Sequence, residues 1–231
     1  MAAKKSKDYC RIASGVQMVD TSFQATDSFV DHMKDVGVSI VARYYDYENE
    51  TLPGKRLREY EIPIISKAGM SILVVFQHNN NKSETFEDWK NRGLNDAERA
   101  LKMATELRQP SGSAIYFGVD GDFVGSIPGI KFYTKEVVGY FSEINKVFEA
   151  DGGKYRIGAY GSGEALRVLK TSDLITLRWL SHSHGFVGSK DALAADRYEI
   201  EQYLPGQCGG RSVDFNSLRD GVSDVGQFKL I

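Results

Sequence analysis

The sequence predicts an α/β protein, and within that class a (β/α)8 TIM-type barrel with an irregular second half. Short apolar runs of strand length alternate with amphipathic stretches of helix length along the 231 residues. Such alternation is typical of parallel strands that are covered by helices on the outside. Three of the apolar runs end in Val-Asp, at 18–20, 117–120 and 213–214. In an all-parallel sheet the three carboxylates would meet at one edge.

A doubly wound open sheet is the alternative architecture for this pattern. In a nucleotide-binding fold of that kind, Gly-x-Gly-x-x-Gly would follow the first strand, and the sequence lacks the motif there. Gly161-Ser162-Gly163 follows the fifth expected strand without the rest of the motif, and we interpret it as a tight turn. The closed barrel is therefore the predicted fold.

The first half of the chain supplies four expected strands and three helices. Phe29, Val30 and Met33 are spaced for one face of the first helix. Pro63 must kink or divide the second helix, which stops at Gly69, a residue typical of a C-cap. The expected strands cover residues 15–20, 38–45, 71–77 and 114–120, and the expected helices cover 27–36, 57–68 and 94–107. A polar stretch at 79–92 is expected to be a long loop at the carboxyl edge of the sheet.

The second half contains less helix. One long helix is expected at 131–150, where Asp151-Gly152-Gly153 closes it, and a short one at 163–169. The expected strands cover residues 155–160, 177–181, 198–203 and 213–215. Residues 15–231 form a single barrel domain in this scheme, and residues 1–14 are expected to be a flexible tail.

Composition narrows the range of functions. The net charge is -2, so no overall basic field would recruit nucleic acid. No apolar stretch approaches the roughly 20 residues of a membrane helix, so no membrane partner is expected. No apolar signal core follows the N-terminal lysines. We therefore expect no Sec export of this chain, and delivery to a periplasm or cell wall would use a route without a cleaved signal.

The two cysteines, Cys10 and Cys208, match no metal-binding spacing. They could pair if the N-terminus packs beside the last strands, but free structural thiols are the favoured interpretation.

Four carboxylates are the candidate catalytic groups: Asp20, Asp120, Asp122 and Asp214. Because side chains alternate along a strand, Asp120 and Asp122 would share one face, about 7 Å apart. Asp20 and Asp214 would approach the same mouth from the first and eighth strands, which are neighbours in a closed barrel. Like charges so close raise at least one pKa, which keeps a carboxylic acid protonated as a general acid. For any single aspartate, a helix cap is the alternative.

Polar and aromatic side chains near the same expected edge are candidate substrate-binding residues. Aromatic faces stack on pyranose rings and amides bind sugar hydroxyls or acetamides, although each residue alone could be an ordinary core or surface side chain. The candidates are Tyr44, Tyr45, Gln77, Tyr160, Trp179 and Gln202.

Metal binding is the alternative role for the four aspartates. His182 and His184 would share a strand face, but they belong to no His-Glu-x-x-His pattern. No Gly-x-Ser-x-Gly elbow is present, and neither cysteine has an assignable partner, so a nucleophilic Ser or Cys is weakly supported. We therefore expect no metal and no cofactor.

Six segments, in order along the chain, resemble a known family. The segments are VDTSFQ (19–24), ARYY (42–45), KRL (55–57), IYFGVDGD (115–122), RIGAYGSG (156–163) and VDFN (213–216). They are similar to the glycoside-hydrolase-like domain formerly catalogued as a domain of unknown function, which is related to the family 25 lysozymes.

The resemblance implies a TIM-type barrel that cuts or binds bacterial peptidoglycan at its β-1,4 bonds. It carries the family's acids over to Asp20, Asp120, Asp122 and Asp214. Family 25 has Glu where this chain has Asp122, and the aspartate side chain is one methylene shorter. That departure affects catalysis more than binding.

The predicted function is therefore an N-acetylmuramidase-like, lysozyme-like glycosidase. Asp122 would be the general acid, Asp120 or Asp20 would stabilise the transition state or orient the acetamide, and Asp214 would position substrate or water. The alternative is a cell-wall glycan-binding module on the same barrel, and a metal-dependent hydrolase comes third. If the protein is a secreted antibacterial effector, an immunity protein would be a further partner.

Overall fold

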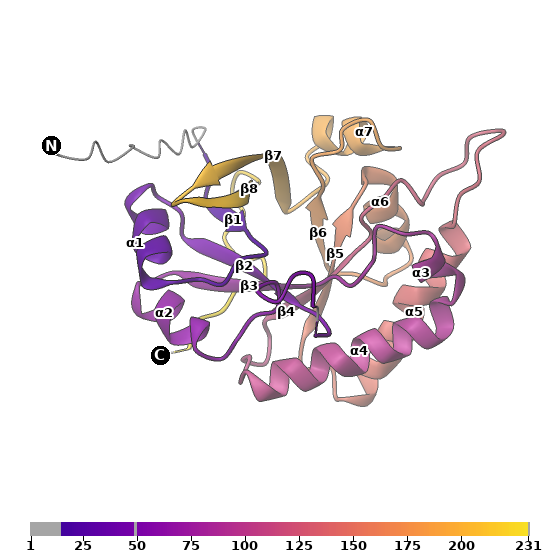
Figure 1. The fold of residues 1–231 in the computed structure, drawn as a ribbon. Coiled ribbons are helices and arrows are strands. Elements are labelled where there is room, and N and C mark those ends of the chain that lie inside the picture. Colours follow the sequence, from indigo (N-terminus) through magenta and orange to yellow (C-terminus); the bar gives the residue numbers. More distant parts are fainter. Residues whose placement is uncertain (1–14, 49, 231) are drawn as a thin grey trace, which may run out of the picture.

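Eight strands close into a barrel in the computed structural model, which describes residues 15–48 and 50–230 (Figure 1). The strands follow one another around the barrel in chain order, and β1 to β7 are parallel. The strands are β1 (Met18–Asp20), β2 (Ile40–Tyr45), β3 (Ser71–Phe76), β4 (Ala114–Gly118), β5 (Arg156–Gly161), β6 (Leu177–Leu180), β7 (Ile200–Cys208) and β8 (Arg211–Leu218). The predicted TIM-type barrel is confirmed.

The expected all-parallel sheet is wrong at the last strand. β8 runs antiparallel to both of its neighbours, β7 and β1. The physical reason is the connection: β7 and β8 are joined only by Gly209 and Gly210, whose φ angles are 57° and 74°. Two residues with positive φ make a tight hairpin, whereas a parallel pair needs a long crossover. Asp214 therefore reaches the mouth from an antiparallel strand, directly opposite Asp20 in the register.

The helices surround the strands and are more numerous than predicted. They are α1 (Asp27–Asp35), α2 (Glu61–Lys67), α3 (Glu84–Glu87), α4 (Trp89–Glu106), α5 (Thr134–Ala150), α6 (Gly163–Thr171) and α7 (Ser189–Ala194). The predicted kink at Pro63 does not arise, because α2 begins at Glu61 and the proline lies in its first turn. Backbone N–H groups there have no partner within the helix, so proline is tolerated.

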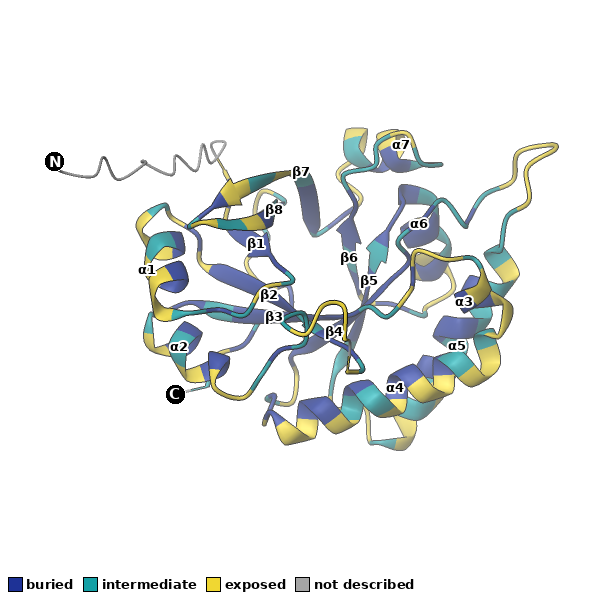
Figure 2. Cartoon of the chain, in the orientation of Figure 1, coloured by how far each residue is buried: buried dark blue, intermediate teal, exposed yellow. Residues whose placement is uncertain are grey.

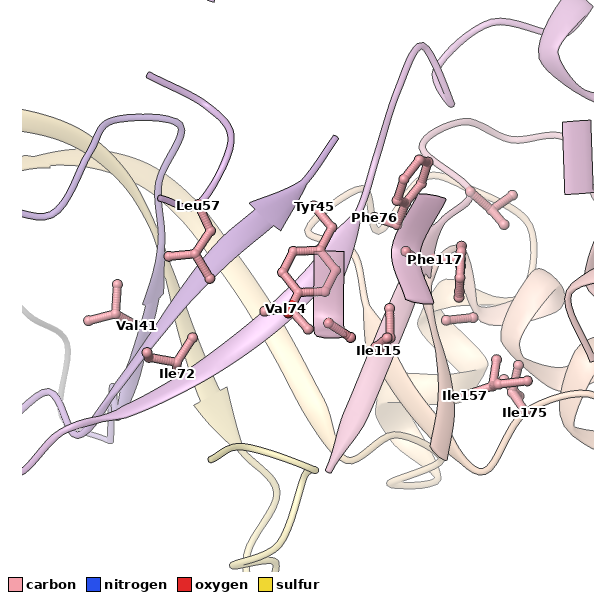
Figure 3. Close-up of a cluster of buried hydrophobic side chains, with 14 of the residues drawn as sticks. Val41, Tyr45, Leu57, Ile72, Val74, Phe76, Ile115, Phe117, Ile157 and Ile175 are labelled. Atoms are coloured by element: carbon pink, nitrogen blue, oxygen red, sulfur yellow. The ribbon is translucent and has the colours of Figure 1, made fainter. Parts of the chain in front are cut away.

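Most strand residues are buried and are dark blue in Figure 2. Alternation along the strands divides their side chains between two clusters. Ala42, Leu73 and Trp179 belong to the cluster inside the barrel. Val74 and Phe117 belong to the larger cluster between the strands and the helices, part of which is drawn in Figure 3. Successive residues of a strand thus have separate roles, one inside and one outside the sheet.

The chain after β8 crosses the amino ends of the strands. The hydroxyl of Tyr116 donates to the backbone oxygen of Val225 (2.9 Å), and the backbone N–H of Ala114 donates to Gly226 (2.9 Å). Val225 is packed in the interior cluster. This end of the barrel is therefore filled, and the carboxyl ends of the parallel strands form the opposite, open end.

A buried ion pair fixes the loop that follows β1. Arg43 on β2 and Glu61 on α2 are both fully buried, and Arg43 Nε lies 2.9 Å from Glu61 Oε2. Arg43 also donates to the backbone oxygens of Thr21 and Gly54. Glu61 in turn accepts from the backbone N–H of Ala25 (2.6 Å). The pair therefore links β2 and α2 to the residues directly after Asp20.

The N-terminal tail expected at 1–14, including Cys10, lies outside the described residues. Cys208 is disulfide-bonded, so the expectation of a free thiol there is wrong. No helix in the described part of the chain is both long and apolar enough to cross a membrane.

Glu61→Ala should lower the free energy of unfolding by about 3–5 kcal/mol, because it leaves the Arg43 charge buried without a partner. Urea denaturation measures this. Glu59→Ala is the matched control: Glu59 and Arg108 form an exposed pair, with side chains 73% and 81% accessible, and we expect a change within about 0.5 kcal/mol. Equal losses in the two variants would contradict this account of the buried pair.

Candidate active site

A cavity of about 350 Å³ opens at the carboxyl ends of the strands. It is lined by Asp20, Tyr44, Val75, Gln77, Asp120, Tyr160, Trp179, Gln202 and Asp214. Eight of these nine residues are predicted from the sequence as site residues. A larger cavity of about 520 Å³ lies beside α6 and α7, but its two acids, Glu164 and Asp191, are outnumbered by lysine and arginine side chains, and Glu164 is paired with Arg167. Converging unpaired acids, not size, therefore identify the candidate site, which we call the acidic mouth.

Asp20 lies at the centre of a hydrogen-bond network in the acidic mouth. Its carboxylate accepts from the hydroxyl of Tyr44 (2.8 Å) and from the side-chain amides of Asn216 (2.9 Å) and Gln202 (3.2 Å). Burial raises the pKa of Asp20, and these three donors oppose the rise because they favour the charged form. The side chain is thus held in one orientation by three different strands.

Asp214 faces Asp20 across the antiparallel β1–β8 pair. Burial, the charge of Asp20 and a hydrogen bond to Asp20 raise the pKa of Asp214 to about 7. Among the described residues, no amide or hydroxyl side chain donates to its carboxylate, in contrast to Asp20. The two acids therefore share a proton near neutral pH, and the donor pattern favours Asp214 as its holder.

Asp120 is the third acid and belongs to the loop after β4. Its Oδ2 accepts from Gln77 Nε2 (2.8 Å), and its backbone N–H donates to the oxygen of Asn80 (3.0 Å). Burial raises the pKa of Asp120, while Gln77 and the positive charge of Lys55 lower it. A nearby cation therefore lowers the pKa of Asp120. No cation in the described part of the chain is among the main groups that lower the pKa of Asp20 or Asp214.

Lys55 is a part of this site that sequence reasoning missed. Its ammonium nitrogen donates to the backbone oxygen of Gln77 (2.6 Å) and lies 3.3 Å from a carboxylate oxygen of Asp46. It also lies 4.9 Å from the ring centroid of Tyr44. Only 12% of its side chain is accessible. The residue stands in one of the segments that resemble the family, but a lysine in a loop gives no signal of such a position.

Asn216 is the second missed residue. Its side-chain oxygen accepts from Trp179 Nε1 (2.8 Å), and its amide donates to Asp20. The sequence does contain a signal, because Asp214 and Asn216 are two apart on one strand and therefore share a face. Trp179 is only 1% accessible, so it forms the floor of the mouth. Tyr44 and Tyr160 are its more accessible aromatic residues.

Tyr45 does not reach the acidic mouth. It follows Tyr44 on β2 and therefore faces the helices, where it is fully buried in the outer core (Figure 3). Its hydroxyl donates to Gln109 (2.8 Å). The alternation of side chains along a strand removes it from the candidate ligand-binding residues.

Asp122 also lies apart from the other acids. β4 ends at Gly118, so the strand alternation that would align Asp122 with Asp120 does not continue through the loop. Its Oδ1 accepts from the backbone N–H of Val187 (3.0 Å), in the segment between β6 and α7. Asp122 therefore anchors a loop and does not line the acidic mouth.

His182 and His184 follow β6 and line a different cavity. Their ring centroids lie 5.3 Å apart, and the rings are inclined by 47°. Within residues 15–48 and 50–230, no three His, Cys, Asp or Glu side chains are grouped so that they could hold a metal ion.

Comparison with known proteins identifies the family of this architecture. Residues 31–217 match the model of the family described as Rv2525c-like, glycoside hydrolase-like domain. The uncharacterized protein YbfG of Bacillus subtilis is 28% identical over 227 residues, which cover 94% of this chain and 30% of YbfG. This chain thus spans less than a third of the length of the curated relatives it matches.

Solved structures agree on the fold. The Tat-secreted protein Rv2525c of Mycobacterium tuberculosis, crystallised with L-tartrate, superimposes with a TM-score of 0.72 at 20% identity, over 93% of this chain and 99% of that one. The modular autolysin LytC of Streptococcus pneumoniae, in complex with a synthetic peptidoglycan ligand, gives a TM-score of 0.56 at 13% identity, over 88% and 46%.

Asp214→Asn should stabilise the fold progressively as pH rises from 5 to 8. A carboxyl whose pKa is raised from its usual value to about 7 stabilises the fold below pH 4, and this contribution is lost as pH rises toward 7. Asparagine cannot ionise beside Asp20. Because solvent screens part of the repulsion, we expect a gain at pH 8 of about 1 kcal/mol, or about 2–4 °C in Tm.

Thermal unfolding of both proteins at pH 5, 6, 7 and 8 measures the effect. A difference in Tm that stays constant or shrinks across that range would contradict the shared proton.

Proposed function

The chain belongs to the Rv2525c-like, glycoside hydrolase-like domain family, and from that premise we propose that it hydrolyses the β-1,4 glycan bonds of peptidoglycan. One observation carries the proposal: Asp20 and Asp214 lie opposite one another in the strand register, in a cavity that also contains Asp120. Such a set supplies a protonated acid and a carboxylate at the same pH, and glycoside hydrolysis needs both. The likeness to an autolysin crystallised with a peptidoglycan ligand supports the substrate class.

Asp214 takes the role of general acid in this proposal. Its pKa of about 7 leaves it protonated in neutral solution about half of the time. It gives its proton to the glycosidic oxygen as the bond from that oxygen to C1 breaks. Asp122, the acid implied by resemblance to family 25, is less suitable because its carboxylate is held by Val187.

Asp120 stabilises the positive charge that develops at C1, either directly or by orienting the substrate acetamide. Lys55 lowers its pKa, which favours the carboxylate that this role requires. Water then adds to C1 and returns a proton to Asp214, so the site is regenerated. Asp20, fixed by three donors, keeps the Asp214 proton in place.

A glycan-binding module without turnover is the second candidate. The observation that favours it is the position of Asp122, since the residue aligned with a catalytic glutamate of family 25 holds a loop here. Tyr44, Tyr160 and Gln77 would then bind the sugar without cleavage. Retention of the protein on insoluble peptidoglycan, with no release of reducing ends, would favour this candidate over hydrolysis.

Asp214→Asn and Asp120→Asn should each lower muropeptide release from purified sacculi by about 100-fold or more, because each removes a group that acts in the transition state. Mass spectrometry of the soluble products measures the rate and identifies the new reducing end.

Asp122→Asn is the matched control and should keep most of the activity, since Asp122 lies outside the mouth. If Asp122→Asn abolished release and the other two variants did not, the assignment of the acid would be wrong.

Lys55→Met should move the acidic limb of the pH–rate profile to higher pH. Without the ammonium group, the pKa of Asp120 rises, so less of the required carboxylate is present in weakly acidic solution. Initial rates of muropeptide release between pH 4 and 8 measure the shift. Lys55→Arg keeps the charge and is the control. An unshifted profile in Lys55→Met would exclude an electrostatic role for Lys55.

A further inference from the structure

A second cavity, of about 510 Å³, lies outside the barrel beside β7. Its polar wall contains His182, His184 and Glu201, and its apolar wall contains Leu204, Pro205 and Phe215. We propose that this cavity binds the stem peptide of peptidoglycan while the glycan lies in the acidic mouth. The inference rests on the proposed function and names the part of the substrate that would determine specificity.

The polar groups of this cavity are arranged for a ligand with several hydrogen-bonding groups. His182 Nδ1 and His184 Nε2 are buried, and neither has a hydrogen-bond partner among the described residues. Buried polar atoms without partners are costly and rare in folded proteins. His184 Nε2 lies 3.8 Å from Glu201 Oε1, too far for a hydrogen bond. The His184 side chain is 36% accessible although its Nε2 is buried, so a rotation of the imidazole would bring this nitrogen to a ligand in the cavity.

The outer cavity and the acidic mouth lie on opposite faces of one strand, β7. Glu201 and Gln202 are consecutive on β7, so Glu201 points to the outer cavity and Gln202 to the mouth. The backbone N–H of His182 donates to Gln202 Oε1 (3.4 Å), and Gln202 Nε2 donates to Asp20. The two cavities are therefore separated by the width of β7, and a branched ligand would have to span that strand to occupy both.

The stem peptide carries charged and apolar groups that are complementary to the side chains of this cavity. It is attached to the lactyl group of N-acetylmuramic acid and presents alanine methyl groups, carboxylates and a free ammonium group. The ammonium group would pair with the buried carboxylate of Glu201. Carboxylate or carbonyl oxygens would accept from the imidazoles, and the methyl groups would pack on Leu204 and Phe215. A glycan without its stem peptide has no ammonium group to pair with Glu201.

Isothermal titration calorimetry with three probes tests the proposal. The probes are the disaccharide of N-acetylglucosamine and N-acetylmuramic acid, the same disaccharide with its stem peptide, and the free stem peptide. We expect the wild-type protein to bind the peptide-bearing disaccharide about tenfold more tightly than the bare one. Glu201→Gln and Leu204→Ser should each reduce that ratio below about threefold and leave binding of the bare disaccharide unchanged.

Leu204 is 64% accessible, so its replacement leaves the packed core intact. Leu94→Ser, at an exposed position on α4, is the matched control and should keep the tenfold ratio. The proposal is overturned if wild type binds both disaccharides equally, or if Glu201→Gln and Leu204→Ser both keep the full ratio.

Failure of the proposed function gives a different result. If sacculi are not cleaved and the bare disaccharide does not bind, the glycan assignment fails. Binding of the free stem peptide that weakens in both cavity variants would still support the outer site. Absence of binding for all three probes would overturn both.

Discussion

The packing of Asp20 against Asp214 is the constraint on which the open end of this barrel depends. Burial raises the pKa of both carboxylates, and the negative charge of Asp20 raises the pKa of Asp214 further. Hydrogen bonds from Tyr44, Gln202 and Asn216 lower the pKa of Asp20 and partly offset the effect of burial. Asp214 has no such donors among the residues that the structure describes. Asp214 is left with the proton. A pair of apolar side chains would be more stable here, so the strain is consistent with chemistry at this position.

The antiparallel eighth strand makes this pairing possible. In an all-parallel barrel, acids at the ends of neighbouring strands are offset along the barrel axis by the stagger between the strands. Here the β1–β8 register places Asp214 directly opposite Asp20 and Asn216 opposite Met18. Asn216 can therefore donate to Asp20 from the next inward position on the same strand. A hairpin of two glycines thus determines the electrostatics of the mouth.

Sequence reasoning predicted the barrel and most of the mouth because both follow from periodicity. The rule that parallel strands end at one edge of a sheet predicts the meeting of Asp20, Asp120 and Asp214. Two candidates fail for different reasons: strand alternation turns Tyr45 to the face opposite Tyr44, and Asp122 lies beyond β4, which ends at Gly118. Lys55 could not be predicted, because a loop has no periodicity and its position depends on tertiary contacts with Asp46 and Gln77.

The absence of a crossover helix between β7 and β8 has a further consequence. Elsewhere in the described chain a helix follows each strand from β1 to β6 and covers the outer face of the sheet. No helix follows β7, so its outer residues remain beside a cavity instead of a helix. One strand then presents Gln202 to the acids and Glu201 to the outside. The same departure from regular barrel topology therefore pairs the acids and supplies a neighbouring surface that a branched substrate, with a glycan and a peptide, could contact at once.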